Sequence, residues 1–157
     1  MAYFILKKIK PKHIAWLIPL AYLVHLFDEY FSGDGFPNWF SGIFDVSLSI
    51  TDFVVINSIG LTATVITAIL YKQGKVNNFI IATLGILFFI NGIIHLIASG
   101  LTATYSPGTI TGTIIYLPLG FVIFKNVFPL IPEQQRILSV IIGILAQVLI
   151  AVVALNI

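Results

Sequence analysis

The sequence predicts an all-α fold: a polytopic bundle of five transmembrane helices that forms a single membrane domain over residues 1–157. The first observation is composition, because 59% of the residues are hydrophobic, 9% are charged and the mean hydropathy is +1.06. A soluble domain carries about 25% charged residues, and a disordered chain needs low hydrophobicity with high charge. Both classes are therefore excluded.

The second observation is that five apolar runs are each long enough for a bilayer, which takes about 20 residues per helix. They cover residues 14–31, 48–71, 78–99, 107–124 and 137–157. Backbone groups in lipid must pair internally, so these runs are expected to be helices.

Single residues mark the bounds of these runs. The first run is too long for a signal peptide and has no small-residue cleavage site, and we expect Pro19 to bend it. The turn 72–75 ends the second run. Ser106 followed by Pro107 predicts an N-cap and first turn for the fourth.

The third observation is the placement of basic residues, which face the cytoplasm in membrane proteins. All eight fall on one side of a five-span bundle: Lys7, Lys8, Lys10, Lys12, Lys72, Lys75, Lys125 and Arg136. The sequence therefore predicts an N-terminus inside and a C-terminus outside. We expect a multi-pass protein of a bacterial cytoplasmic (inner) membrane.

The connection 33–47 carries aromatic residues at helical spacing. Phe36, Trp39, Phe40 and Phe44 would share one face of a helix. Such a face is typical of an aromatic anchor at the headgroup level, or of an amphipathic lid over a site in the outer leaflet.

Ionisable residues inside a span are costly and usually face a protein interior or a cavity. The first span contains His25, Asp28 and Glu29, with His25 and Glu29 one turn apart on one face. The third contains Asn91 and His95 at the same spacing. With a rise of about 1.5 Å per residue, these residues fall in one layer in the outer half of the membrane.

No Lys or Arg lies near these two carboxylates in the predicted arrangement. A divalent metal would neutralise them and use neutral imidazoles as ligands. We therefore predict a metal site of His25, Glu29 and His95 with an open position, zinc being favoured over iron. Asp28 is a further ligand, a hydrogen-bond partner of a histidine or a general base.

Other polar residues near this layer have two interpretations each. Asn91 is a further metal ligand or an interhelical hydrogen-bonding residue. Tyr105 is a catalytic proton donor at the mouth of the site or an interfacial aromatic residue, and Asp52 lines the outer side or is merely solvated. His13, among the lysines, is expected to be interfacial.

The segment His25-Leu26-Phe27-Asp28-Glu29, with Asn91-x-x-x-His95 and Tyr105-Ser106-Pro107-Gly108 after it, resembles a family of small bacterial membrane proteins named for an H-x-x-E-E motif. The resemblance spans roughly residues 14–125, and Asp28 stands where the motif has Glu. The family has no settled biochemical function, so the resemblance supports the site and not a substrate.

Three functions fit these residues. The first is a metal-dependent intramembrane enzyme, hydrolase-like, with catalytic roles for Asp28, Glu29 and Tyr105 and a lipid or other lipophilic small molecule as substrate. The second is a proton-coupled binding or transport protein for a lipophilic ligand. The third is a b-type haem protein with His25 and His95 as axial ligands. The expected partner is the lipid bilayer and not a nucleic acid, and a homo-oligomer is left open.

Overall fold

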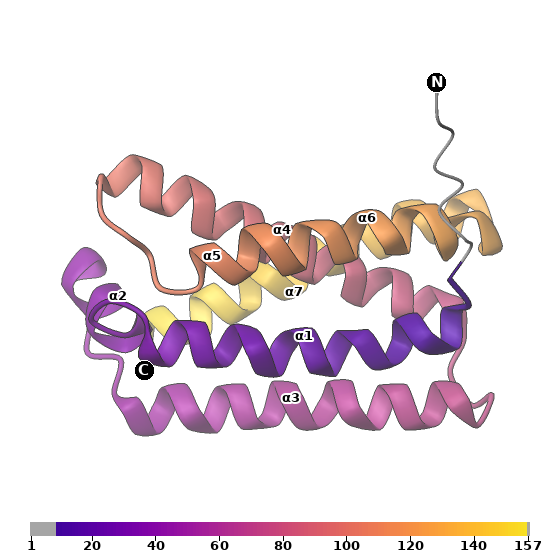
Figure 1. Cartoon of the computed structure of the whole chain (residues 1–157), viewed down its shortest axis with the longest axis horizontal. Helices are drawn as coiled ribbons and strands as arrows, with labels where there is room; N and C mark the ends of the chain where they lie inside the picture. The colour runs from indigo at the N-terminus through magenta and orange to yellow at the C-terminus, as the bar shows by residue number, and fades with distance from the viewer. Residues whose placement is uncertain (1–8, 157) are drawn as a thin grey trace.

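The computed structural model describes residues 9–156 and contains five helices long and apolar enough to cross a membrane. Four are continuous: α1 (Pro11–Phe31), α3 (Ile50–Lys72), α4 (Asn78–Thr102) and α7 (Glu133–Leu155). The fourth span along the chain, Thr109–Leu130, is built from shorter pieces. The five predicted helices are thus present as candidate membrane spans, and they run side by side in an elongated bundle (Figure 1).

Local side chains define where two of these helices begin. The Ser49 hydroxyl accepts a hydrogen bond from the Asp52 N–H at the start of α3. The Asn77 side chain accepts one from the Phe79 N–H at the start of α4. Each cap satisfies a backbone donor that the first helical turn leaves free. Both helices begin within two residues of their predicted starts. Pro19 lies inside a continuous α1.

The fourth span differs from an ordinary helix. A short α5 (Thr109–Thr111) leads into a π-helical turn, η1 (Gly112–Tyr116), then α6 (Leu117–Asn126) and the 3₁₀ turn η2 (Phe128–Leu130). Pro118 has no N–H to donate to the carbonyl four residues earlier. The preceding N–H, that of Leu117, donates to the Gly112 carbonyl five residues earlier, which is the spacing of a π turn. The wider π turn therefore compensates for the proline.

The predicted start of this span is wrong. Helix α5 begins at Thr109 and its N-cap position is Gly108, which has no side chain to cap the helix. The Ser106 hydroxyl lies instead 3.1 Å from His95 Nδ1, and the Ser106 N–H donates to Ser99 Oγ. Gly108 has a φ of 96°, a conformation that favours glycine.

One buried core joins α1, α4 and the fourth span. Helix α3 packs on the outside of this core along α1, and α7 packs along α4. Small residues allow close approach around α4, where Gly85 faces Ile123 and Gly143 faces Ile86. Many large apolar side chains on α1, α3 and α7 are exposed and suit a lipid environment.

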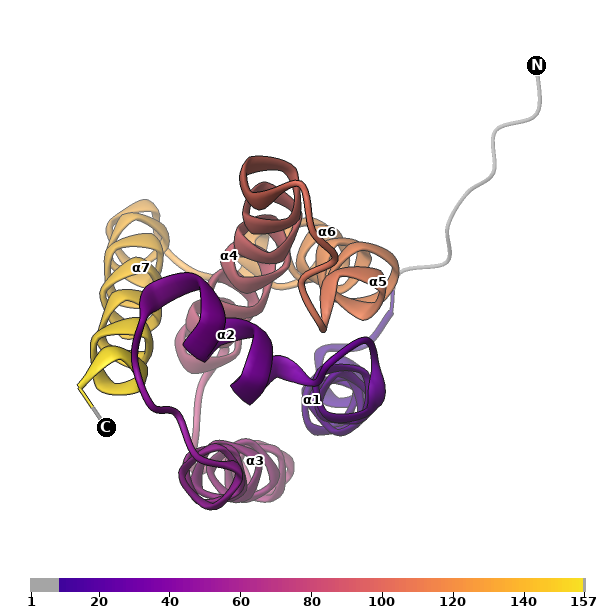
Figure 2. The ribbon, with the colours of Figure 1, turned by 90° about the vertical axis from the view of Figure 1, so that its left-hand side faces the viewer.

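The two ends of the bundle differ in charge. The basic residues within 9–156 lie at or next to the end where α3 joins α4 and α6 leads to α7 (Figure 1). Lys7 and Lys8 lie outside the described residues. At the opposite end, α2 (Phe36–Phe44) lies across the mouth of the bundle (Figure 2). Which end faces the cytoplasm stays a prediction.

Candidate metal centre

Three side chains from two helices meet inside the bundle near α2. His25 and Glu29 lie one turn apart on α1, and His95 comes from α4. Glu29 Oε1 lies 3.5 Å from His25 Nε2 and 3.3 Å from His95 Nε2. One ligand atom from each residue can be chosen so that all three lie within 4.8 Å of one another. The side chains are thus already gathered at the separation that a single metal ion requires.

All three residues are almost inaccessible to solvent, with 1% of His25, 6% of Glu29 and 4% of His95 exposed. Across residues 9–156, the only basic side chains at ion-pair distance from a carboxylate are the two imidazoles beside Glu29, which are charged only when protonated. The expectation that no Lys or Arg neutralises this carboxylate therefore holds for the part of the chain that the structure describes. A buried carboxylate needs such compensation, and a metal ion supplies it.

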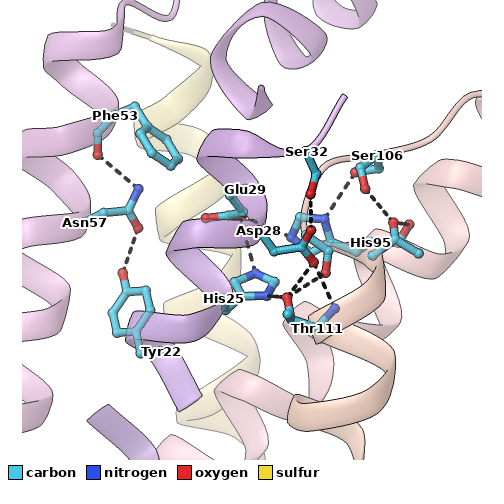
Figure 3. A network of polar contacts seen from close by, with 12 residues as sticks. Tyr22, His25, Asp28, Glu29, Ser32, Phe53, Asn57, His95, Ser106 and Thr111 are labelled. Carbon is cyan, nitrogen blue, oxygen red and sulfur yellow. Dashed lines mark hydrogen bonds and ion pairs between the residues drawn. The ribbon is translucent and has the colours of Figure 1, made fainter. Parts of the chain in front are cut away.

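Hydrogen bonds to Thr111 determine which nitrogen of His25 carries the proton. The Thr111 hydroxyl donates to Asp28 Oδ2 over 2.7 Å and lies 2.7 Å from His25 Nδ1 (Figure 3). Since its single proton goes to the carboxylate, the hydroxyl accepts from the Nδ1–H of His25. In the neutral form of His25 with this proton, the lone pair is on Nε2, the atom that faces Glu29 and is buried without a hydrogen-bond partner. A histidine ligand requires this tautomer.

Asp28 is held by four donors. It accepts from the N–H and hydroxyl of Thr111, from the Ser32 hydroxyl at 2.5 Å and from the Tyr105 hydroxyl at 3.0 Å. The three cluster residues are not among these donors. The two adjacent acids of α1 therefore face different surroundings: Glu29 contacts the imidazoles directly, and Asp28 reaches His25 through Thr111.

The backbone of Gly108 lies directly against the cluster. A Cβ atom on this residue would lie 2.8 Å from His95 Cε1 and 2.9 Å from both His25 Cε1 and Glu29 Cγ. The turn between α4 and α5 thus lies so close to the cluster that a side chain at this position would collide with it. It also carries Ser106, whose hydroxyl orients His95.

The cluster opens into a cavity of about 380 Å³. Its walls are mostly apolar and come from α1, α3, α4, α7 and the π turn, together with the aromatic face of α2. Phe36, Trp39, Phe40 and Phe44, the aromatic face predicted from spacing, all line it. The Trp39 indole N–H donates to Thr104 Oγ1 over 3.0 Å and connects α2 to the α4–α5 connection. Helix α2 thus turns its aromatic face to the cavity, and its role as a lid or as a headgroup-level anchor stays a prediction.

The remaining predicted residues lie around the cluster. Asn91 lines the same cavity one turn from His95, and its Oδ1 is buried without a partner. The Tyr105 hydroxyl donates to Asp28 and therefore contacts a neighbour of the cluster rather than one of its three residues. Asp52 bonds to Ser49 at the start of α3 and is absent from the cavity lining.

Sequence reasoning missed two residues of the site. These are Thr111 and Tyr116, which both belong to the fourth span. In the structure the Tyr116 ring packs on His25 with centroids 4.2 Å apart, and its buried hydroxyl has no partner. The usable signal was Pro118, because a proline inside a span predicts an irregular turn, and such turns are frequent at functional sites.

The fold and the cluster define a membrane-type helical bundle with a buried histidine–glutamate site. Residues 16–123 match the family described as proteins of unknown function with an HXXEE motif. The match covers more than half of the chain, which therefore belongs to this family, as its motifs predicted. No curated protein and no solved structure matches the sequence.

Proposed function

We propose that this protein is a membrane-embedded, metal-dependent enzyme that holds one divalent ion through His25 Nε2, Glu29 Oε1 and His95 Nε2. The observation that carries the proposal is the His25 Nε2 atom, which is buried, unpartnered and grouped with the other two ligand atoms. Two imidazoles and one carboxylate are a known ligand set of catalytic zinc sites, which keep an open position. Non-haem iron uses a similar set and is the second candidate ion.

The cavity indicates an amphiphilic substrate. It is mostly apolar, and its lining includes all three residues of the cluster. A zinc ion at such a site supplies a Lewis acid and an activated water molecule, so hydrolysis of a lipid or a related molecule is the reaction class we propose. Asp28 and Tyr105, predicted as catalytic, become positioning residues in this proposal because they reach the cluster through Thr111.

The geometry favours a single ion over haem. The imidazole centroids of His25 and His95 are 5.0 Å apart in an edge-to-face arrangement, with Glu29 Oε1 within 3.5 Å of both Nε2 atoms. Two axial ligands must lie on opposite sides of a flat macrocycle, and this spacing leaves no room for one between the rings.

Elemental analysis of the purified protein tests the proposal. We expect about one zinc or iron per chain, and loss of that metal in Glu29→Gln and His95→Ala. His13→Ala is the matched control, because His13 is an exposed histidine on the same helix as His25 and should retain the metal.

A thermal unfolding series provides the second measurement. A metal at about one hundred times its dissociation constant stabilises the folded state by about 2.7 kcal/mol, which raises Tm by roughly 5–10 °C for a chain of this size. Metal-free protein whose unfolding is unchanged by zinc and by iron contradicts the proposal. That result would favour proton-coupled binding or transport of a lipophilic ligand by the same cluster.

A further inference from the structure

We propose that the cavity beneath α2 binds a single-chain amphiphile with a hydroxyl head group, held by Tyr116 and Asn91 beside the cluster. The inference names the substrate or product class of the proposed enzyme and rests on that proposed function for its link to a reaction. Binding itself requires only the cavity and these two side chains.

The distribution of unpartnered polar atoms carries the inference. Within residues 9–156, three buried side-chain atoms have no hydrogen-bond partner: His25 Nε2, Asn91 Oδ1 and Tyr116 OH. All three residues line the same cavity. An unpaired buried polar atom destabilises the folded chain, so three such atoms around one space indicate a polar ligand there. The proposed metal ion would bind His25 Nε2, whereas Asn91 Oδ1 and Tyr116 OH would still have no partner.

The chemistry of these two groups points to a hydroxyl. The Tyr116 phenol can donate and Asn91 Oδ1 can accept, whereas a ligand hydroxyl accepts one hydrogen bond and donates another. If the amide oxygen and nitrogen of Asn91 exchange places, the NH₂ group donates a hydrogen bond, which the oxygen of the same ligand hydroxyl can accept. A hydrocarbon would leave both groups unpaired.

Packing fixes the phenol in place. Tyr116 is 1% exposed, and its ring packs against His25 and Phe88 with centroid distances of 4.2 and 4.6 Å. A neighbouring tyrosine provides a comparison, since the Tyr22 hydroxyl in the same cavity is already bonded to Asn57 Oδ1 over 2.8 Å (Figure 3). The Tyr116 hydroxyl therefore stands apart from the other phenol of the lining.

The shape of the cavity favours one chain. Its lining on α4 runs from Leu84 to Ala98, about 21 Å at 1.5 Å per residue. A cavity of about 380 Å³ whose lining extends over that length has room for one alkyl chain along α4. The volume holds about a dozen groups of water or methylene size, and two full acyl chains would exceed it.

Fluorescence of Trp39 gives a direct binding assay. Trp39 lines the cavity, and the second tryptophan of the chain, Trp16, is replaced by Phe to leave one reporter. The probe is a primary alcohol of about twelve carbons with bromine on its second carbon, titrated into metal-free protein in nanodiscs. The comparison ligand is the bromoalkane of equal length without the hydroxyl.

We expect the alcohol to bind more tightly than the alkane, and Tyr116→Phe or Asn91→Leu to weaken the alcohol by about three- to ten-fold each. Tyr22→Phe is the matched control and should leave the preference for the alcohol intact. Equal affinity of the unmodified site for alcohol and alkane overturns the inference, and this comparison does not depend on the folding of any Tyr116 or Asn91 variant.

Thermal unfolding separates a binding role from a structural one. Because its hydroxyl is unpaired, Tyr116→Phe should be as stable as the parent or more stable. A clear loss of stability in this variant overturns the inference, since it shows a structural partner for the phenol. All these measurements use metal-free protein. If the preference for the alcohol is not found, the metal content measured for the proposed function still stands. If the protein binds no metal, the preference for the alcohol can still be measured.

Discussion

The Thr111 hydroxyl lies 2.7 Å from His25 Nδ1 and donates to Asp28 over the same distance. Through this bond a carboxylate on α1 determines the tautomer of a histidine one turn away on the same helix. Carboxylate–histidine pairs of this kind orient metal ligands in many proteins, and here a hydroxyl is inserted between the partners. The relationship connects the fourth span to the first at the centre of the site.

Removing the Thr111 hydroxyl should weaken metal binding without abolishing it. Thr111→Val keeps the shape of the side chain but leaves His25 Nδ1 without its acceptor, so we expect metal affinity to fall by about 10- to 100-fold. Competition with a chelator of known affinity measures the change. Thr111→Ser should retain most of the affinity.

Thr113→Val is the control for a hydroxyl on the same span, because Thr113 bonds only to the carbonyl of Thr109. A Thr111→Val protein that binds metal as tightly as the Thr113 variant would show that the hydroxyl does not position His25.

Gly108→Ala should disrupt the cluster. Its added Cβ would lie under 3.0 Å from His25, Glu29 and His95, in a backbone conformation with φ of 96°. We expect loss of both metal binding and stability, measured by elemental analysis and thermal unfolding.

Gly74→Ala is the control that separates the effect of backbone strain from the effect of a steric clash with the cluster. Gly74 also has a positive φ, 72°, but nothing lies within 4 Å of its added Cβ. This variant should lose only about 1–3 kcal/mol to backbone strain and bind metal normally. Equal metal loss in the two variants would assign the Gly108 effect to strain alone.

Tyr105 should make stability depend on pH in the alkaline range. Burial, together with the hydrogen bond to Asp28 and its charge, raises the pKa of Tyr105 above its usual value of about 10. The unfolded chain then loses its proton at lower pH than the folded one. The stabilisation is complete below about pH 10 and declines as pH rises through the folded pKa.

Thermal unfolding in nanodiscs from about pH 8 to 12 should therefore show a steeper alkaline loss in the parent than in Tyr105→Phe. Identical pH profiles of the two proteins would show that Tyr105 titrates as it does in the unfolded chain.

The bond between Trp39 and Thr104 should hold the α2 lid closed. Trp39→Phe keeps an aromatic ring in the cavity wall but removes the 3.0 Å hydrogen bond to Thr104. Loss of one such bond should speed hydrogen exchange in α2 by about three- to ten-fold. Trp16→Phe, on the exposed face of α1, should leave α2 exchange unchanged, and equal rates in both variants would argue against this lid contact.

The sequence allowed much of the bundle to be predicted because lipid permits few alternatives. Apolar runs and the basic residues indicated five spans, and the spacing of Phe36, Trp39, Phe40 and Phe44 indicated the face of α2 that lines the cavity. His25, Glu29 and His95 came together as helical spacing and depth predicted. Charged residues inside a membrane are rare enough to stand out.

What could not be predicted depends on backbone geometry and neutral hydroxyls. Ser106 was interpreted as a helix cap from its neighbour Pro107, but its hydroxyl faces His95 because Gly108 turns the chain first. Tyr116 lies on the π turn and Thr111 directly precedes it, and the register of this turn shifts side chains relative to an ordinary helix. No spacing rule for an α-helix places these two residues at the site.

X-ray absorption spectroscopy at the zinc and iron edges, on the purified protein, tests the central claim most directly. We expect one ion with two imidazole nitrogens and carboxylate oxygen at about 2.0–2.2 Å, and loss of this signal in Glu29→Gln. An ion bound without imidazole ligands, or a spectrum unchanged by Glu29→Gln, would contradict a metal centre formed by His25, Glu29 and His95.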